Sequence, residues 1–197
     1  MKKITLVALL MVLFCGTTLS AKSFDWSKCW CNYGGGIKEK DIIVNIDAVL
    51  YYSDISNSKY DGFWFVPPVL VEVQYAKKIW ELPFTFGGYA GIRACGYDYD
   101  IWDTANNKFV SREAKYLGLM LGGEIAYHMQ FPPEGLDLYA VTRLGTNIPF
   151  SKSGQGWKSP YVDFGAACGA NWFFGDFFGV NLEFGHPYTK IGVTLKF

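Results

Sequence analysis

The 197-residue sequence lacks several features that would each indicate a class of function. It has only 2 histidines, and its 18 basic and 18 acidic residues cancel to a formal net charge of zero. A chain without an excess of basic residues has no electrostatic footprint for a nucleic acid. Beyond its N-terminal stretch there is also no apolar run near the roughly 20 residues that a transmembrane helix requires. A nucleic-acid-binding protein and a membrane protein built of helices are therefore excluded.

The one continuous apolar run is at the start of the chain. Two lysines precede an apolar stretch over residues 4–14, and small and polar residues follow as far as Ala21. A charged start, a short apolar centre and a small-residue exit are typical of a secretory signal peptide. We therefore expect residues 1–21 to be removed on export and residues 22–41 to remain as an N-terminal periplasmic segment.

The chain is rich in apolar residues: half of all its residues are hydrophobic and 18% are aromatic. In its last segment Ile191, Val193, Leu195 and Phe197 lie on one phase, with polar or small residues on the other. This period of two is that of a β-strand with two different faces. Eight such segments occur, at 42–52, 69–76, 84–95, 116–129, 136–145, 162–174, 177–184 and 188–197. Their apolar phase contains no Asp, Glu, Lys or Arg and is suited to face lipid. We therefore predict an all-β fold, an eight-stranded antiparallel up-and-down transmembrane β-barrel over residues 42–197.

The connections between these segments differ in length. Three long ones, 53–68, 96–113 and 146–160, alternate with shorter ones. Because bacterial barrels have long outer loops and short inner turns, we expect these three to be extracellular and to be the candidate contacts for an external ligand. Aromatic residues near the segment ends are expected to form girdles at the membrane boundaries, where amphipathic rings are favoured. The predicted girdle residues are Tyr75, Phe84, Phe86, Tyr127, Trp172, Phe178 and Phe197 on the periplasmic side, and Tyr52, Phe164 and Phe184 on the outer side.

The polar phase of the strands carries charged residues at similar depths. An eight-stranded barrel has an interior just wide enough for side chains to fill it, and buried charges require partners. We therefore predict a plugged, salt-bridged lumen in which Glu124 lies between Arg93 and Arg143, and glycines of the same phase make room for the long charged side chains. The predicted charge network consists of Asp47, Glu72, Arg93, Glu124, Arg143, Glu183 and Lys190.

No catalytic or metal-binding motif accompanies this pattern. His128 falls on the inward phase without a nearby serine, and His186 lies in a tight connection that also lacks one. Cys29 and Cys31 form a Cys-x-Cys pair with no further Cys or His at the spacing of a zinc site. We expect no enzymatic activity, no cofactor and no metal.

The C-terminal pattern Lys190-x-Gly192-x-x-Leu195-x-Phe197 resembles the β-signal by which the barrel-assembly machinery recognises its clients. Over residues 42–197 the predicted architecture resembles the small eight-stranded outer-membrane proteins of the OmpX, OmpW and OmpA transmembrane-domain type, and only the last strand matches as a motif. This resemblance implies residence in the outer membrane of a diderm bacterium, contact with outer-membrane lipid, and Gly192, Leu195 and Phe197 as the assembly signal.

The resemblance leaves two functions open. A plugged barrel of the OmpX or OmpA type would act as a structural or surface-interaction protein through its outer loops, and the charged inward phase favours it. An OmpW-like barrel would pass small hydrophobic solutes. A soluble ligand-binding barrel of lipocalin type is a third alternative, since it would turn the apolar phase inward around a ligand. The terminal Phe197 and the aromatic girdles favour the membrane.

Overall fold

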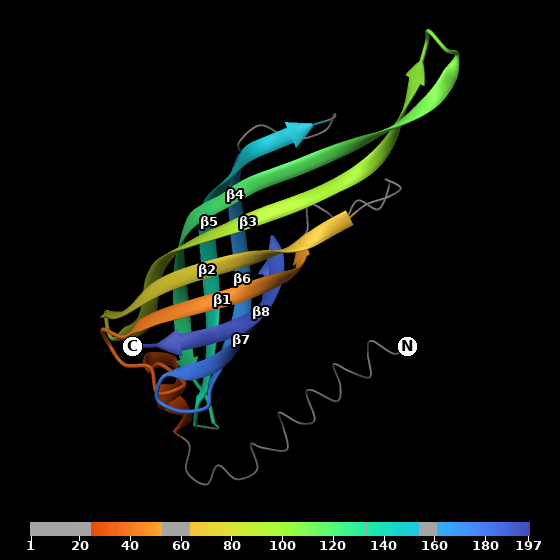
Figure 1. Cartoon of the computed structure of the whole chain (residues 1–197). Helices are drawn as coiled ribbons and strands as arrows, with labels where there is room; N and C mark the ends of the chain where they lie inside the picture. The colour runs from red at the N-terminus through yellow and green to blue at the C-terminus, as the bar shows by residue number, and fades with distance from the viewer. Residues whose placement is uncertain (1–24, 53–63, 133, 154–160) are drawn as a thin grey trace.

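The computed structural model describes residues 25–52, 64–132, 134–153 and 161–197, so the expected signal peptide lies outside the described residues. The described strands form one closed antiparallel barrel in which β1 pairs with β8 and every other strand pairs with its sequence neighbours (Figure 1). The predicted all-β fold, an eight-stranded antiparallel up-and-down barrel, is confirmed. The elements are η1, a 3₁₀ helix (Trp26–Cys31), and the strands β1 (Ile42–Tyr52), β2 (Trp64–Ile79), β3 (Leu82–Asp103), β4 (Lys108–Gln130), β5 (Leu136–Ser153), β6 (Tyr161–Phe173), β7 (Phe178–His186) and β8 (Tyr188–Lys196). In the described part of the chain, no helix has the length and apolar character needed to cross a membrane.

The two faces of the strands differ as the alternation predicts. On β1, Asn45 and Asp47 are buried, whereas Ile46 and Leu50 on the other phase are 42% and 56% exposed. The same division recurs around the barrel, so that the outer wall is rich in exposed Val, Ile, Leu and Phe side chains while charged side chains are inside. This is the reverse of the arrangement expected for a soluble ligand-binding barrel.

The two ends of the barrel also differ. At one end the strands are joined by short turns, of which Trp80 and Glu81 between β2 and β3 form the tightest, and the N-terminal segment and Phe197 lie at the same end (Figure 1). We call this the short-turn end. At the opposite end β3 and β4 continue beyond the other strands as a paired ribbon, and we call this the long-hairpin end.

The segment 96–113, expected to be a loop, is mostly strand. β3 and β4 remain in register out to the pair Asp103 and Lys108, which leaves a turn of only four residues, 104–107. Beyond the barrel the ribbon has one exposed face, with Asp98, Asp100 and Trp102, and one mostly half-buried face, with Tyr99 and Ile101. The alternation over residues 97–101 is short, and the length of this connection favours a loop instead. The other two expected loops are also shorter, because β2 begins at Trp64 and β5 continues to Ser153. The remaining parts of those loops, 53–63 and 154–160, lie outside the described residues.

Candidate functional site

The interior of the barrel contains a polar layer enclosed between two apolar clusters. From the short-turn end, the inward residues of β1 are Ile43, Asn45, Asp47 and Val49, so that polar residues lie between two apolar ones. The cluster towards the long-hairpin end consists of Val49, Leu70, Tyr89, Met120 and Tyr188. The cluster at the short-turn end consists of Tyr33, Ile37, Ile43, Ala76 and Phe173. The polar layer is thus covered by apolar side chains along the barrel axis in both directions.

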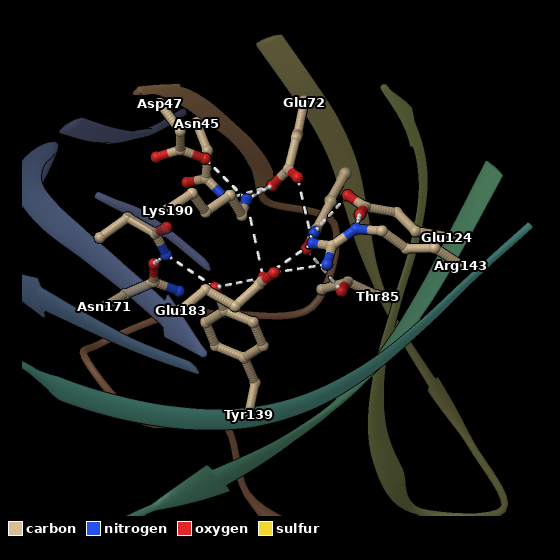
Figure 2. A network of polar contacts seen from close by, with 12 residues as sticks. Asn45, Asp47, Glu72, Thr85, Glu124, Tyr139, Arg143, Asn171, Glu183 and Lys190 are labelled. Carbon is tan, nitrogen blue, oxygen red and sulfur yellow. Dashed lines mark hydrogen bonds and ion pairs between the residues drawn. The ribbon is translucent and has the colours of Figure 1, made fainter. Parts of the chain in front are cut away.

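Arg143 of β5 is the first of two cations in the polar layer, and it binds three carboxylates. Its Nε donates to Glu124 at 2.7 Å, and its Nη1 and Nη2 donate to the two oxygens of Glu183 at 2.5 and 2.7 Å (Figure 2). Nη2 also donates to Glu72 at 3.0 Å. The planar guanidinium offers five N–H donors in a fixed fork, which matches this arrangement of acceptors. The side chain of Arg143 is 2% exposed, so these bonds form without competition from bulk water.

Lys190 of β8 is the second cation. Its Nζ lies 2.6 Å from Asp47, 2.5 Å from Glu72 and 3.6 Å from Glu183. Glu72 and Glu183 therefore lie between Lys190 and Arg143 and bind both (Figure 2). The structure brings six of the seven predicted network residues into one cluster of two cations and four carboxylates: Asp47, Glu72, Glu124, Arg143, Glu183 and Lys190.

Arg93 is the seventh predicted residue, and the structure places it elsewhere. Its guanidinium lies over the ring of Tyr116, 5.3 Å from the centroid. On β4 the residue opposite Arg93 is Gly118, six residues from Glu124 or about 20 Å at the rise of a β-strand. The expected bridge from Glu124 to both arginines is therefore replaced by a contact of Glu124 with Arg143 and Gln74. Depth counted along each strand separately misses the stagger between strands that closes a barrel.

A chain of hydrogen bonds leads from Glu124 towards the short-turn end. Gln74 Nε2 donates to Glu124 at 2.6 Å, and the hydroxyl of Thr85 donates to Gln74 Oε1 at 2.7 Å. The Thr85 oxygen lies 2.9 Å from Nε2 of His128, whose Nδ1 lies 2.8 Å from Oδ2 of Asp137. The chain thus joins the ionic cluster to a buried histidine–aspartate pair.

A second chain reaches Asp137 from Glu183. Tyr139 donates its hydroxyl to Glu183 at 3.0 Å and accepts from Asn181 at 2.7 Å. Asn181 also donates to Asn171 at 2.7 Å, and Asn171 donates to Asp137 at 3.0 Å. The charge pattern of the sequence did not reveal the uncharged members of either chain. The only sign of them in the sequence is that Gln74, Asn171 and Asn181 place amide side chains on the inward phase of their strands.

The residues between η1 and β1 close the short-turn end and connect directly to these chains. Gly34 N–H donates to Asp137 at 3.2 Å, Gly35 N–H donates to the Leu136 carbonyl at 3.0 Å, and Lys196 Nζ donates to the Gly35 carbonyl at 3.0 Å. Gly35 has a φ of 60°, a left-handed conformation that glycine adopts without strain. The part of the predicted N-terminal segment that follows η1 is therefore a plug packed into the mouth of the barrel.

Tyr33 fixes the plug to the rim. Its hydroxyl donates to the Phe84 carbonyl at 2.7 Å, and its ring belongs to the apolar cluster at this end. Burial raises the pKa of the Tyr33 hydroxyl, and the carboxylates of Glu39 and Asp137 raise it further. The hydroxyl accordingly remains protonated and continues to donate.

Several inward-facing glycines accommodate tyrosine rings in addition to the expected charged side chains. The ring of Tyr89 covers Gly122, the residue opposite it on β4, and extends over Gly145 on β5. A Cβ at Gly122 would lie 2.5 Å from that ring. Tyr139 covers Gly169 of β6 in the same way. Gly192 does serve a charged residue, since a Cβ there would collide with the side chain of Asp47.

Thr85, His128 and Asp137 have the hydrogen-bonding order of a nucleophile, a base and an acid. All three are at most 1% exposed, and the Thr85 hydroxyl is already bound to Gln74, so no substrate has access to them. Within the described residues, no group of His, Cys, Asp and Glu is arranged to hold a metal ion. Cys29 and Cys31 are both free thiols. The polar atoms of the Thr85, His128 and Asp137 side chains are bound to one another and to Gln74, Gly34 and Asn171.

The fold and the interior together define a closed eight-stranded antiparallel β-barrel whose lumen is occupied by a buried ionic and hydrogen-bonded network. No protein-family model, curated protein or solved structure matches the chain.

Proposed function

We propose that this protein is an outer-membrane β-barrel of a diderm bacterium, with the short-turn end in the periplasm and the long-hairpin end outside the cell. The exposed apolar outer wall supports this proposal, because a bacterial barrel turns such a wall to lipid. Aromatic contacts at the short-turn end also support it: the ring of Phe84 lies 5.4 Å from that of Tyr127, and the ring of Phe177 lies 5.9 Å from that of Phe197. Such a band of rings suits a membrane–water interface.

We further propose that the lumen is plugged and that the protein does not conduct. The observation that carries this proposal is the ionic cluster of Arg143, Lys190 and four carboxylates, sealed by an apolar cluster at each end. A water-filled path through this layer would have to separate these ion pairs, whose members are at most 2% exposed and bind one another directly. The N-terminal plug adds a second closure on the periplasmic side.

With a closed lumen, the working surface is the long-hairpin end. The β3–β4 ribbon carries Trp102 and Phe109 side by side near its tip, with ring centroids 4.9 Å apart and exposed fractions of 48% and 69%. A paired ribbon fixes these rings in position, and exposed aromatic anchors are common in binding surfaces. We propose that segments 53–68, 96–113 and 146–160 contact an external partner, with this aromatic pair as the anchor.

The proposed assembly signal lies at the seam that closes the barrel. The backbone N–H of Phe197 donates to the Ile42 carbonyl at 2.9 Å, and Ile42 N–H donates back at 2.9 Å. Gly192 lies opposite Asp47, where no side chain would fit. Leu195 pairs with Val44 on one side and Phe178 on the other. A segment that forms the last seam is well placed to be read by the barrel-assembly machinery before closure.

A flux assay on the protein refolded into liposomes tests the closed lumen. Small polar solutes and small apolar solutes are each compared with empty vesicles, after co-flotation with lipid has shown that the protein is inserted. We expect no flux of either solute above the empty vesicles. Selective flux of the apolar solutes would overturn the closed lumen in favour of OmpW-like passage of hydrophobic molecules.

A further inference from the structure

The 3₁₀ helix η1 lies at the rim of the barrel against the aromatic band of the outer wall. The carbonyl of Trp30 accepts a hydrogen bond from the hydroxyl of Tyr127, an outward-phase residue whose ring contacts that of Phe84. The ring of Trp26 meets that of Phe131 edge-on, with centroids 5.9 Å apart and an interplanar angle of 74°. η1 is therefore continuous with the aromatic band and is not part of the lumen.

The residues after η1 cross from this rim into the mouth of the barrel. Tyr33 binds the Phe84 carbonyl at the rim, and Gly34 binds Asp137 inside. Only a few residues thus separate the contact of Trp30 with the outer wall from the contact of Gly34 with the polar chains. An interaction that fixes η1 at the rim therefore also restricts the position of the plug.

The side chains of η1 have the chemistry of a membrane–water interface. Trp26 and Trp30 are 61% and 56% exposed, which is unusual for two large rings on one short element. Lys28 between them has a side chain that is 71% exposed; its one ion pair in the described chain is a 3.6 Å contact with the similarly exposed Asp25. Tryptophan is enriched at the headgroup level, where its ring body meets acyl chains and its N–H meets water, and lysine suits the lipid phosphates.

We propose that η1 is a membrane anchor that docks Trp26 and Trp30 into the headgroup region of the periplasmic leaflet, with Lys28 on the phosphates, and so holds the plug in the mouth. This inference rests on the proposed function, since it requires the outer wall to be in lipid. The partner is phospholipid because the surface that η1 continues, around Phe84 and Tyr127, would itself be in contact with lipid. The lipid that surrounds Tyr127 must then also reach Trp30.

Tryptophan quenching by brominated lipids tests the anchor. The wild-type protein and the W26F/W30F variant are refolded into phosphatidylcholine vesicles with bromine either high in the acyl chain, near the headgroups, or deep in it. The difference between the two proteins isolates the fluorescence of Trp26 and Trp30. We expect this component to be quenched several-fold more by the shallow bromines than by the deep ones.

Two matched variants separate failure of the anchor from failure of the membrane assignment. Trp172 lies on the outer wall and is 40% exposed, so the W172F difference reports whether the barrel itself is in lipid. Trp102 lies near the tip of the β3–β4 ribbon, so the W102F difference should show no bromine quenching. If the Trp172 component is quenched and the Trp26 and Trp30 component is not, the anchor is wrong and the barrel assignment stands. If neither is quenched in a protein that remains folded by circular dichroism, the membrane assignment itself fails.

Discussion

Arg143 and Glu183 form a two-point ion pair across strands that are not neighbours. Arg143 is on β5 and Glu183 is on β7, yet Nη1 and Nη2 lie 2.5 and 2.7 Å from the two carboxylate oxygens. On the intervening strand β6, the residues opposite Arg143 and Glu183 are Gly165 and Gly169, so no long side chain stands between them. The charge network therefore combines ion pairs between adjacent strands, such as that of Arg143 with Glu124, with pairs that cross the barrel interior.

Substitutions at Arg143 and at Glu124 should differ in their effect on the free energy of unfolding. Arg143→Leu leaves Glu72, Glu124 and Glu183 with Lys190 as the remaining cation of the cluster, and we expect it to cost about 3–5 kcal/mol in the free energy of unfolding. Glu124→Gln leaves Arg143 bound to Glu72 and Glu183. Its amide NH2 must, however, face a donor, either Arg143 Nε or Gln74 Nε2, so we expect a smaller cost of about 1–3 kcal/mol. Urea unfolding of the protein refolded in detergent measures both.

The control for this comparison is Arg112→Leu, the same change on the exposed part of β4. It should alter the free energy of unfolding by no more than about 0.5 kcal/mol. Equal costs for Arg143→Leu and Glu124→Gln would contradict the central role of Arg143. A negligible cost for both would show that the cluster is hydrated.

The sequence predicts which residues point into the barrel better than it predicts their positions along the barrel axis. A period of two determines which residues point inward, and it does so correctly for Asp47, Glu72 and Glu183. It carries no information on how far each strand is shifted against the next, which is why Arg93 was grouped with Glu124 although it lies beside Tyr116. The β3–β4 ribbon is predicted as a loop for a different reason: its alternation of apolar and acidic residues extends only over 97–101, which is too short to stand out within a long connection.

The packing of tyrosine on glycine gives a second prediction. Gly122→Ala would place a Cβ 2.5 Å from the ring of Tyr89, and overpacking of this kind costs about 1–3 kcal/mol. The neighbouring Gly123→Ala is the control, because it faces outward and its Cβ would meet nothing closer than 3.7 Å. In a Tyr89→Leu background the cost of Gly122→Ala should fall, and a double-mutant cycle measures the coupling. An unchanged cost in that background would show that the strain arises from the backbone.

The hydrogen-bond directions around Thr85 predict which ring nitrogens of His128 carry a hydrogen. The Thr85 hydroxyl has one proton, which it donates to Gln74 Oε1, so its oxygen must accept from His128. We therefore expect Nε2 of His128 to carry a hydrogen. Nδ1 must carry one as well, because Oδ2 of Asp137, which already accepts from Asn171, faces it as an acceptor. Long-range ¹H–¹⁵N correlation spectra of the imidazole rings measure this directly, and the exposed His186 provides the reference signal in the same spectrum. An unprotonated Nε2 would mean that the Gln74 amide is reversed.

Thr85→Val tests the same chain energetically. It preserves the shape of the side chain but leaves Gln74 Oε1 and His128 Nε2 buried without the hydroxyl, which we expect to cost about 1–3 kcal/mol. Thr85→Ser retains the hydroxyl and should recover most of the loss. If Val and Ser behave alike, packing and not hydrogen bonding decides the role of this position.

Deletion of Phe197 separates the proposed assembly signal from barrel stability. The deletion removes two backbone hydrogen bonds with Ile42 and the ring contact with Phe177, and both losses are confined to the last seam. We expect the truncated chain to refold in detergent with a modestly lowered urea midpoint, because the other strand pairs remain intact. In cells we expect it to accumulate in the periplasm, because recognition by the assembly machinery precedes closure. The measurement is the ratio of outer-membrane to periplasmic protein, with Phe197→Tyr as the control that retains an aromatic terminus. Equal outer-membrane levels for the deletion and the wild type would show that the terminal residue serves the seam alone.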